Sequence, residues 1–124
     1  MSDDGVAERP LRWVGDSRKQ IGRFPEPVKD EMGYALWIAQ QGGKARSAKP
    51  LKGFKGSGVL ELVEDFDGDT YRAVYTVRFK SAVYVLHCFQ KKSRKGIETP
   101  KAEVDLIVER LRRAERDERE RRTT

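Results

Sequence analysis

The sequence of 124 residues contains only one cysteine and one histidine. Cys88 therefore cannot form an intrachain disulfide, and a zinc site of the usual kind needs more thiol and imidazole ligands. No apolar run approaches the roughly 20 residues that cross a bilayer. The first ten residues are polar and acidic and lack the hydrophobic stretch of a secretory signal. We therefore expect a cytoplasmic protein with a reduced, buried Cys88 and no metal or other cofactor.

Length and charge are typical of one small, basic domain. Apolar and charged residues each make up 37% of the chain, which suffices for one core under a strongly solvated surface. The formal net charge is +6. The positive charge lies mid-chain, because residues 44–58 hold five cations and no acid, while residues 72–101 hold eight cations and one acid. This distribution favours a polyanionic partner.

The hydrophobic pattern predicts an α+β domain at residues 11–114, preceded by a disordered leader at 1–10 and followed by a charged tail at 115–124. The expected elements, in chain order, are a strand at 11–15, helices at 16–24 and 26–41, a basic glycine-bearing loop at 44–58, strands at 59–64, 71–79 and 82–91, and a helix after Pro100. Helical spacing gives the second helix one buried stripe, listed here: Val28, Met32, Ala35, Leu36 and Ala39. The apolar stripe of the last helix ends at Ala114, so the tail can be helical only in solution or on a partner.

The register of the last two strands decides which side chains can act together. A two-residue turn at Lys80-Ser81 pairs positions whose numbers add to 161. One face is then apolar and must take the helices: Tyr71, Ala73, Tyr75, Val77, Tyr84, Leu86 and Cys88. We expect the other face to meet solvent, with Arg72 opposite Phe89, Val74 opposite His87, and Arg78 and Lys91 further along.

The residues on this second face are suited to RNA chemistry. Arg72 and Lys91 can hold a phosphate and stabilise added negative charge, Phe89 can stack an unpaired base, and His87 can move a proton. Plainer interpretations stay open. A single histidine on the polar side of a sheet is often inert, Arg72 can instead pair with acids between 61 and 69, and the basic run 91–95 can be a solvated loop.

Several segments, read together, resemble the RelE/ParE toxin superfamily, in particular its HigB-like, phage-derived branch. They are Leu51-Lys52-Gly53, Val59-Leu60-Glu61-Leu62, Tyr71-Arg72-Ala73-Val74-Tyr75, and the run from Val85 through His87-Cys88-Phe89-Gln90-Lys91-Lys92-Ser93 to Thr99-Pro100. The resemblance implies a RelE-like β-α-α-β-β-β-α order with a twisted antiparallel sheet packed on helices. It also implies a type II toxin that acts as a ribosome-dependent endoribonuclease, cleaves translated mRNA and arrests growth. The implied partners are a helix-turn-helix antitoxin, the ribosome and mRNA.

The resemblance also assigns roles to individual residues. Arg72 matches the strand arginine that contacts phosphate, and Lys92, or Lys91 one place earlier, matches the basic residue after the last strand. With His87 these are the candidate catalytic residues. The candidate RNA-binding residues are basic or aromatic and lie near them in the sequence: Lys49, Lys52, Lys55, Arg78, Phe89, Arg94 and Lys95.

The chain also departs from the pattern of RelE. RelE has a lysine pair where this sequence reads Leu60-Glu61-Leu62-Val63, and its late catalytic tyrosine has no counterpart near Ile97-Glu98-Thr99. An acid–base role therefore falls on His87, on a lysine, or on no residue. The departures keep open a ParE-like inhibitor of DNA gyrase that cuts no RNA, a non-enzymatic nucleic-acid-binding regulator, and a phage relic without toxicity.

Overall fold

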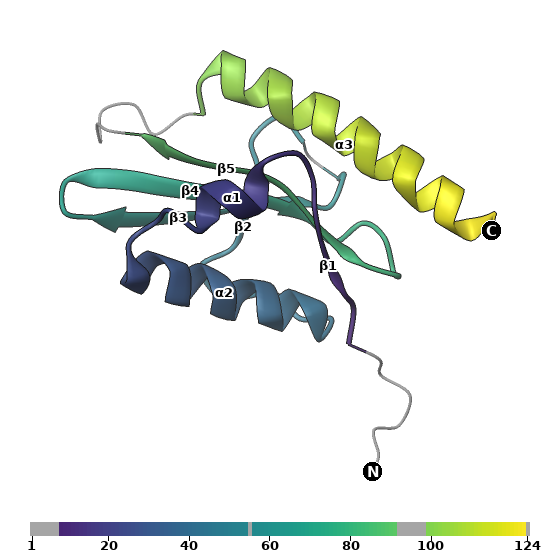
Figure 1. The fold of residues 1–124 in the computed structure, drawn as a ribbon, viewed down its shortest axis with the longest axis horizontal. Coiled ribbons are helices and arrows are strands. Elements are labelled where there is room, and N and C mark those ends of the chain that lie inside the picture. The colour runs from purple at the N-terminus through teal and green to yellow at the C-terminus, as the bar shows by residue number, and fades with distance from the viewer. Residues whose placement is uncertain (1–7, 55, 92–98, 124) are drawn as a thin grey trace, which may run out of the picture.

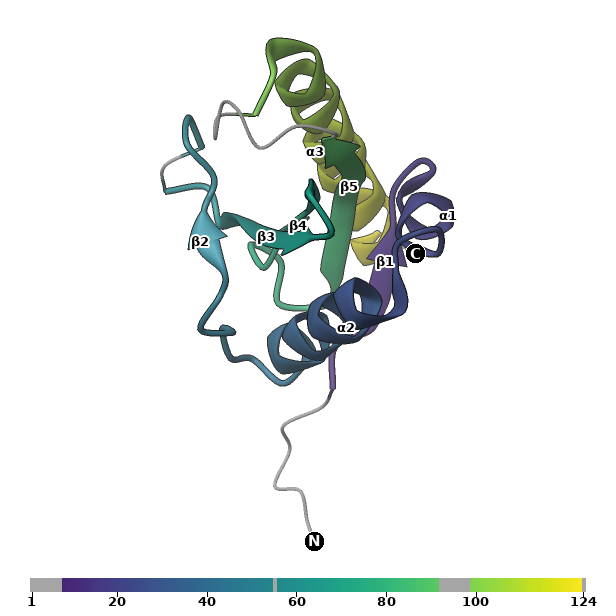
Figure 2. The same cartoon turned by 90° about the vertical axis from the view of Figure 1, so that its left-hand side faces the viewer.

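Five strands form one sheet with helices on both faces (Figure 1). The computed structural model describes residues 8–54, 56–91 and 99–123. The elements are β1 (Leu11–Trp13), α1 (Ser17–Ile21), α2 (Glu26–Gln40), β2 (Lys49–Pro50), β3 (Val59–Phe66), β4 (Asp69–Thr76), β5 (Val83–Lys91) and α3 (Lys101–Arg122). Figure 2 shows α2 and α3 on opposite sides of the sheet. The predicted α+β class is confirmed, and none of the described helices has the length and apolar character needed to cross a membrane.

The strand order is β1-β5-β4-β3-β2, and the sheet is antiparallel except at one edge. There β1 runs parallel to β5, with Leu11 beside Val83 and Trp13 beside Val85. At the other edge β2 adds a strand inside the region expected to be only a loop. The two-residue strand forms because Leu51, which follows it, is buried and donates its N–H to Val59 O at 3.0 Å.

Helix α2 follows the predicted pattern closely. Pro25 precedes its first residue and Pro27 lies in its first turn, where the missing N–H of proline costs no helical hydrogen bond. Its five buried residues are the five of the predicted stripe. They pack on one face of the sheet with apolar residues of the three central strands: Leu60, Leu62, Tyr71, Ala73, Tyr75, Val83, Val85 and Cys88.

The β3–β4 hairpin closes on Asp67-Gly68, and the two strands extend beyond their predicted ends at 64 and 71, to Phe66 and Asp69. Asp65 pairs with Thr70 and Phe66 with Asp69. Both turn residues have positive φ, +53° at Asp67 and +88° at Gly68. Asp and Gly are the residues that tolerate this conformation in a two-residue hairpin turn.

The β4–β5 pairing agrees with the predicted register only at one end. Arg72 lies opposite Phe89, and Val74 opposite His87, as predicted. A bulge follows Val74, so that Tyr75 lies opposite Val85 and Leu86 is left without an opposite residue. The predicted pairs of Tyr75 with Leu86 and of Val77 with Tyr84 are therefore wrong. Strand β4 ends at Thr76, and the connection is longer than the predicted turn at Lys80-Ser81.

The bulge exchanges the two faces of β5, because one extra residue reverses the alternation of side chains. Val83 and Val85 face α2, whereas Tyr84 and Leu86 pack with Ile107 of α3. The second face is thereby apolar over half its length, and α3 covers it. The expectation that this face meets solvent is wrong.

Helix α3 continues to Arg122, through the predicted tail. Polar contacts hold this part of α3 on the β4–β5 hairpin of the same chain. The Tyr84 hydroxyl lies 2.8 Å from the Asp117 carboxylate and 3.1 Å from that of Glu118, which is 6% exposed. Arg78 pairs with Glu115 nearer the middle of the helix. The expectation that this segment is helical only in solution or on a partner is wrong, because polar contacts rather than apolar ones hold it on the sheet.

Candidate functional site

The predicted site residues of β4 and β5 lie on one face, as the sequence indicated. Arg72 is opposite Phe89 of β5. His87 lies two residues before Phe89 on this strand, and Lys91 lies two residues after it. The exposed fractions are 4% for Arg72, 5% for His87 and 9% for Phe89. The predicted grouping on one face is confirmed, but α3 contacts His87 from above and Thr99 contacts Arg72, so neither side chain meets solvent freely.

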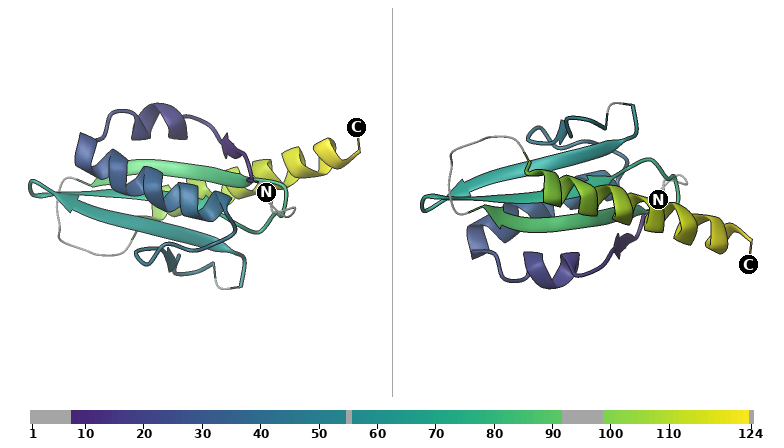
Figure 3. Two further views of the ribbon diagram at one scale, coloured as in Figure 1. Left: turned by 90° about the horizontal axis from the view of Figure 1, so that it is seen from below. Right: turned by 90° about the horizontal axis from the view of Figure 1, so that it is seen from above.

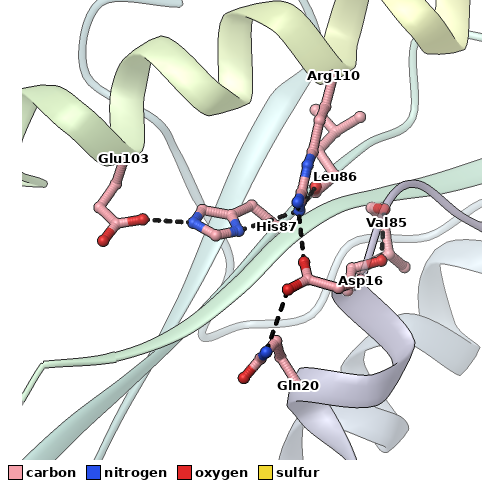
Figure 4. A network of polar contacts seen from close by, with 8 residues as sticks. Asp16, Gln20, Val85, Leu86, His87, Glu103 and Arg110 are labelled. Carbon is pink, nitrogen blue, oxygen red and sulfur yellow. Dashed lines mark hydrogen bonds and ion pairs between the residues drawn. The ribbon is translucent and has the colours of Figure 1, made fainter.

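Both ring nitrogens of His87 are engaged (Figure 4). Nε2 lies 2.5 Å from Glu103 Oε1, and Nδ1 lies 3.2 Å from Nη1 of Arg110. A guanidinium can only donate, so Nδ1 accepts and the ring proton lies on Nε2, which donates to Glu103. The imidazole also stacks on Phe89 with ring centroids 4.8 Å apart. His87 is thus fixed in position and in tautomer.

Arg110 connects three elements through one guanidinium. It donates from Nη1 to the carbonyl of Leu86 at 3.0 Å and from Nη2 to Asp16 Oδ1 at 2.8 Å (Figure 4). Leu86 is the bulge residue, so Arg110 satisfies a carbonyl at the point where the strand ladder is interrupted. The hydrogen bond from Arg110 lowers the pKa of Asp16 below its ordinary value.

The close approach of Arg110 to the chain before α1 requires a glycine. Gly15 has a φ of +58°, and a Cβ there would lie 2.7 Å from the guanidinium carbon. The backbone of Gly15 therefore allows both the turn into α1 and the contact between Asp16 and Arg110.

Arg72 is held from two sides. Its Nη1 lies 3.4 Å from Thr99 Oγ1 and 3.5 Å from Glu61 Oε1 on β3. The interpretation that Arg72 pairs with an acid between 61 and 69 is thus confirmed. Burial raises the pKa of Glu61, while the positive charges of Arg72 and Lys49 act in the opposite direction.

Comparison with known proteins identifies the family. Residues 19–112 match the model of the family described as "Phage derived protein Gp49-like (DUF891)". The chain belongs to the Gp49-like family. The predicted phage-derived, HigB-like branch of the RelE/ParE superfamily is thereby confirmed.

The other comparisons add little beyond the family. One solved structure, the toxin–antitoxin complex RelBE2 from Mycobacterium tuberculosis, contains a chain that aligns over its full length (100%) with 73% of this chain. The aligned residues are 16% identical, and the TM-score is 0.45. A search of curated proteins found no match.

The remaining predicted site residues of this Gp49-like chain do not all join the cluster. Lys49 on β2 and Lys52 after it are exposed. Arg78 lies beyond the end of β4, where its Nε donates to Ser57 O at 3.2 Å and its guanidinium pairs with Glu115. Four candidates fall outside the described residues: Lys55, Lys92, Arg94 and Lys95.

Three polar residues of the site, Asp16, Glu103 and Arg110, were not predicted. A signal for two of them is present in α3. Glu103 and Arg110 share the helical stripe of Ile107 and Ala114, so both must point toward the sheet. A charged residue at such a position needs a polar partner beneath it.

The site of the Gp49-like chain combines an oriented carboxylate with nearby cations. The Glu103 side chain is 33% exposed, in contrast to 7% for that of His87, and His87 orients one of its oxygens. A carboxylate in this setting can accept a proton from a hydroxyl group. Among the described residues no group of histidine, cysteine, aspartate and glutamate side chains is arranged to hold a metal ion. Proton transfer by the carboxylate and charge stabilisation by the cations are the chemistry that these side chains offer.

Proposed function

We propose that this chain is the toxin of a type II toxin–antitoxin system and that it cleaves translated mRNA on the ribosome. Membership in the phage-derived Gp49-like family and the resemblance to the RelE/ParE superfamily support the assignment. The observation that carries the nuclease proposal is the placement of Arg72, His87 and Lys91 on one face, with the Glu103 carboxylate oriented by His87.

In the proposed reaction Glu103 is the general base. It takes the proton of a ribose 2′-hydroxyl, whose oxygen forms a bond to the adjacent phosphorus while the bond from phosphorus to the 5′-oxygen breaks. The leaving oxygen takes a proton from the Lys91 ammonium group or from water. Arg72 neutralises the charge that develops on the phosphate. His87 is then a positioning residue, whose Nε2–H holds the carboxylate in place.

The burial of Arg72 supports a dependence on the ribosome. Thr99 and Glu61 occupy its guanidinium in the free chain, so a phosphate must replace both partners. Thr99 lies just before α3, and Glu103 lies in its first turn. Contact of the ribosome with this region would expose Arg72 and Glu103 together. A free enzyme with its cation covered is expected to leave mRNA intact.

The partner proposed for this toxin is a helix-turn-helix antitoxin encoded beside it. Co-expression of the neighbouring gene should restore growth, and the two proteins should purify together. A chain that is harmless when expressed alone, with no such neighbour, would contradict the assignment as a toxin.

Primer extension on an mRNA under translation in a cell-free system tests the nuclease. Wild-type protein should produce cuts within the reading frame, and Glu103→Gln should lower their rate by about 100-fold or more, since general-base catalysis contributes on that order. Glutamine still accepts the hydrogen bond from His87 but cannot take the proton. The control Glu109→Gln changes an exposed residue of the same helix and should be fully active.

Two results would count against this proposal. Absence of cuts by the wild-type protein would remove the nuclease, and full activity of Glu103→Gln would remove Glu103 as the base. The burial of Arg72 and His87 favours one alternative, an inhibitor of DNA gyrase. That alternative predicts growth arrest with a DNA-damage response, intact mRNA and inhibited supercoiling by gyrase in vitro.

A further inference from the structure

A groove lies between β1 and the C-terminal half of α3. It has a volume of about 610 Å³, and it is lined by the whole of β1 on one side and by residues of α3 between 113 and 121 on the other. Figure 3 shows the end of α3 passing beside β1. The groove contains none of the side chains proposed for RNA cleavage, and Gly15, which borders Asp16, is the one residue of the site region that lines it.

The β1 side of the groove is the edge of the sheet. On its inner side β1 bonds to β5, where Pro10 O accepts from Val83 N–H at 3.0 Å and Val14 N–H donates to Val85 O at 2.9 Å. Alternate residues of a parallel strand point to its neighbour, so the N–H and C=O groups of Leu11 and Trp13 point outward. Within residues 8–54, 56–91 and 99–123 the backbone of these two residues makes no hydrogen bond on that outer side.

Both sides of the groove contribute positive charge, since the α3 residues that line it carry a net charge of +1 and Arg12 of β1 adds one more. Four arginines line it, and two acids, so it carries a net charge of +2: Arg12, Arg113, Arg116 and Arg121, with Asp117 and Glu120. One acid is already neutralised, because Asp117 binds Arg121 at 2.8 Å. Arg12 lies opposite Tyr84, whose side chain faces α3. The Nε atom of Arg12 is buried and has no hydrogen-bond partner among the described residues.

We propose that this groove binds an extended, net acidic segment of a partner protein, which adds a strand to the sheet beside β1. The outward N–H and C=O groups repeat at the spacing of a strand, and a polypeptide can bond to both kinds. A nucleic acid matches this edge poorly, because a phosphate backbone has no donors for the two carbonyls. The acidic side chains of the added strand would meet Arg113 and Arg116, which stand exposed on α3.

Nuclear magnetic resonance on the full, ¹⁵N-labelled chain tests the proposal with a short synthetic peptide of alternating valine and glutamate. The peptide should shift the amide signals of Leu11 and Trp13 and slow their hydrogen exchange. The double variant Arg113→Glu with Arg116→Glu should weaken binding by about tenfold or more, since reversing close charges changes attraction into repulsion. The matched control, Arg112→Glu with Arg119→Glu, makes the same change in charge on exposed residues of α3 that do not line the groove.

Three further samples complete the test. A peptide of alternating valine and lysine should not bind. A short single-stranded RNA should leave the Leu11 and Trp13 signals unchanged, and these signals should also stay unchanged when the free chain is diluted. Equal binding of both peptides, or loss of binding in the control variant, would refute the proposed charge recognition. RNA binding that depends on Arg113 and Arg116 would make the groove a nucleic-acid site, and dilution-dependent signals would make it a contact between two copies. Each of these results overturns the proposal.

Discussion

Tyr84→Phe removes the polar contact that holds the end of α3 on the sheet. The Tyr84 hydroxyl lies 2.8 Å from Asp117 and 3.1 Å from Glu118. The change leaves the ring in place, including its edge contact with Phe79 at 5.4 Å between centroids. What is lost is one donor to two carboxylates, one of them buried.

The size of the effect follows from the burial of Glu118. A hydrogen bond to a charged group contributes about 1.5–3 kcal/mol, and an unsatisfied buried group costs a similar amount. Glu118 is 6% exposed and keeps the hydroxyl of Ser81 as a partner, so it loses only one of its two hydrogen bonds. Asp117 is less buried and keeps Arg121. We expect the free energy of unfolding to fall by about 2 kcal/mol.

The same substitution at Tyr75 is a matched control. Tyr75 is fully buried, and its hydroxyl has no hydrogen-bond partner among the described residues. Burial raises the pKa of Tyr75 to about 12. Because no hydrogen bond is lost, Tyr75→Phe should leave the free energy of unfolding unchanged within about 0.5 kcal/mol or raise it slightly.

Urea unfolding followed by circular dichroism measures both variants against the wild type. The slope with denaturant should be the same in all three proteins, so that the midpoints report stability. A Tyr84→Phe protein as stable as the wild type, or a Tyr75→Phe protein less stable than Tyr84→Phe, would refute this account of α3.

Two further predictions concern the network under α3. Arg110→Met removes the donor to Leu86 O and to His87 Nδ1, and it should lower the free energy of unfolding by about 3 kcal/mol, as expected for buried charged partners. Urea unfolding should show no such loss for the exposed Arg112→Met, and an equal loss in that variant would contradict the network. Burial raises the pKa of the Cys88 thiol to about 12, against a smaller opposing effect of Arg110. Iodoacetamide at mildly alkaline pH should therefore modify Cys88 only as fast as the chain unfolds, and rapid labelling of the native protein would show that Cys88 is not buried.

The elements that the sequence predicts best are those whose pattern is local. The buried residues of α2 recur at helical spacing, and each of them lies in the core. The turn between β3 and β4 lies inside the gap left between the predicted strands, and it narrows to Asp67-Gly68, two residues that accept positive φ. In both places neighbouring residues in the sequence determine the outcome, so no knowledge of the rest of the fold is needed.

The bulge in β5 could not be predicted in this way, because it depends on how two strands meet. A two-residue turn at Lys80-Ser81 implies a register that holds from Thr70 to Val74 and fails from Tyr75 onward. The composition of β5 does argue against a solvent-exposed face of the sheet. The segment 82–89 is apolar at seven of its eight positions, all but His87, and a strand of that kind is typical of burial on both sides. Alternation, which the predicted solvent face required, is absent there.

The polar residues of α3 explain why its cover over the sheet is specific. An unpaired charge in an apolar interface costs several kcal/mol, so Arg110 can lie on the buried stripe of α3 only where the sheet offers it hydrogen-bond acceptors. The bulge supplies one of them, because the carbonyl of Leu86 has left the regular ladder and accepts from Arg110 at 3.0 Å. The same guanidinium then fixes the tautomer of His87, which directs Nε2–H to Glu103. The orientation of the proposed general base therefore depends on an irregularity in the strand. A variant that regularised β5 would keep His87 opposite Val74 but would return the Leu86 carbonyl to the ladder, and Arg110 would lose one of the acceptors that hold it against His87.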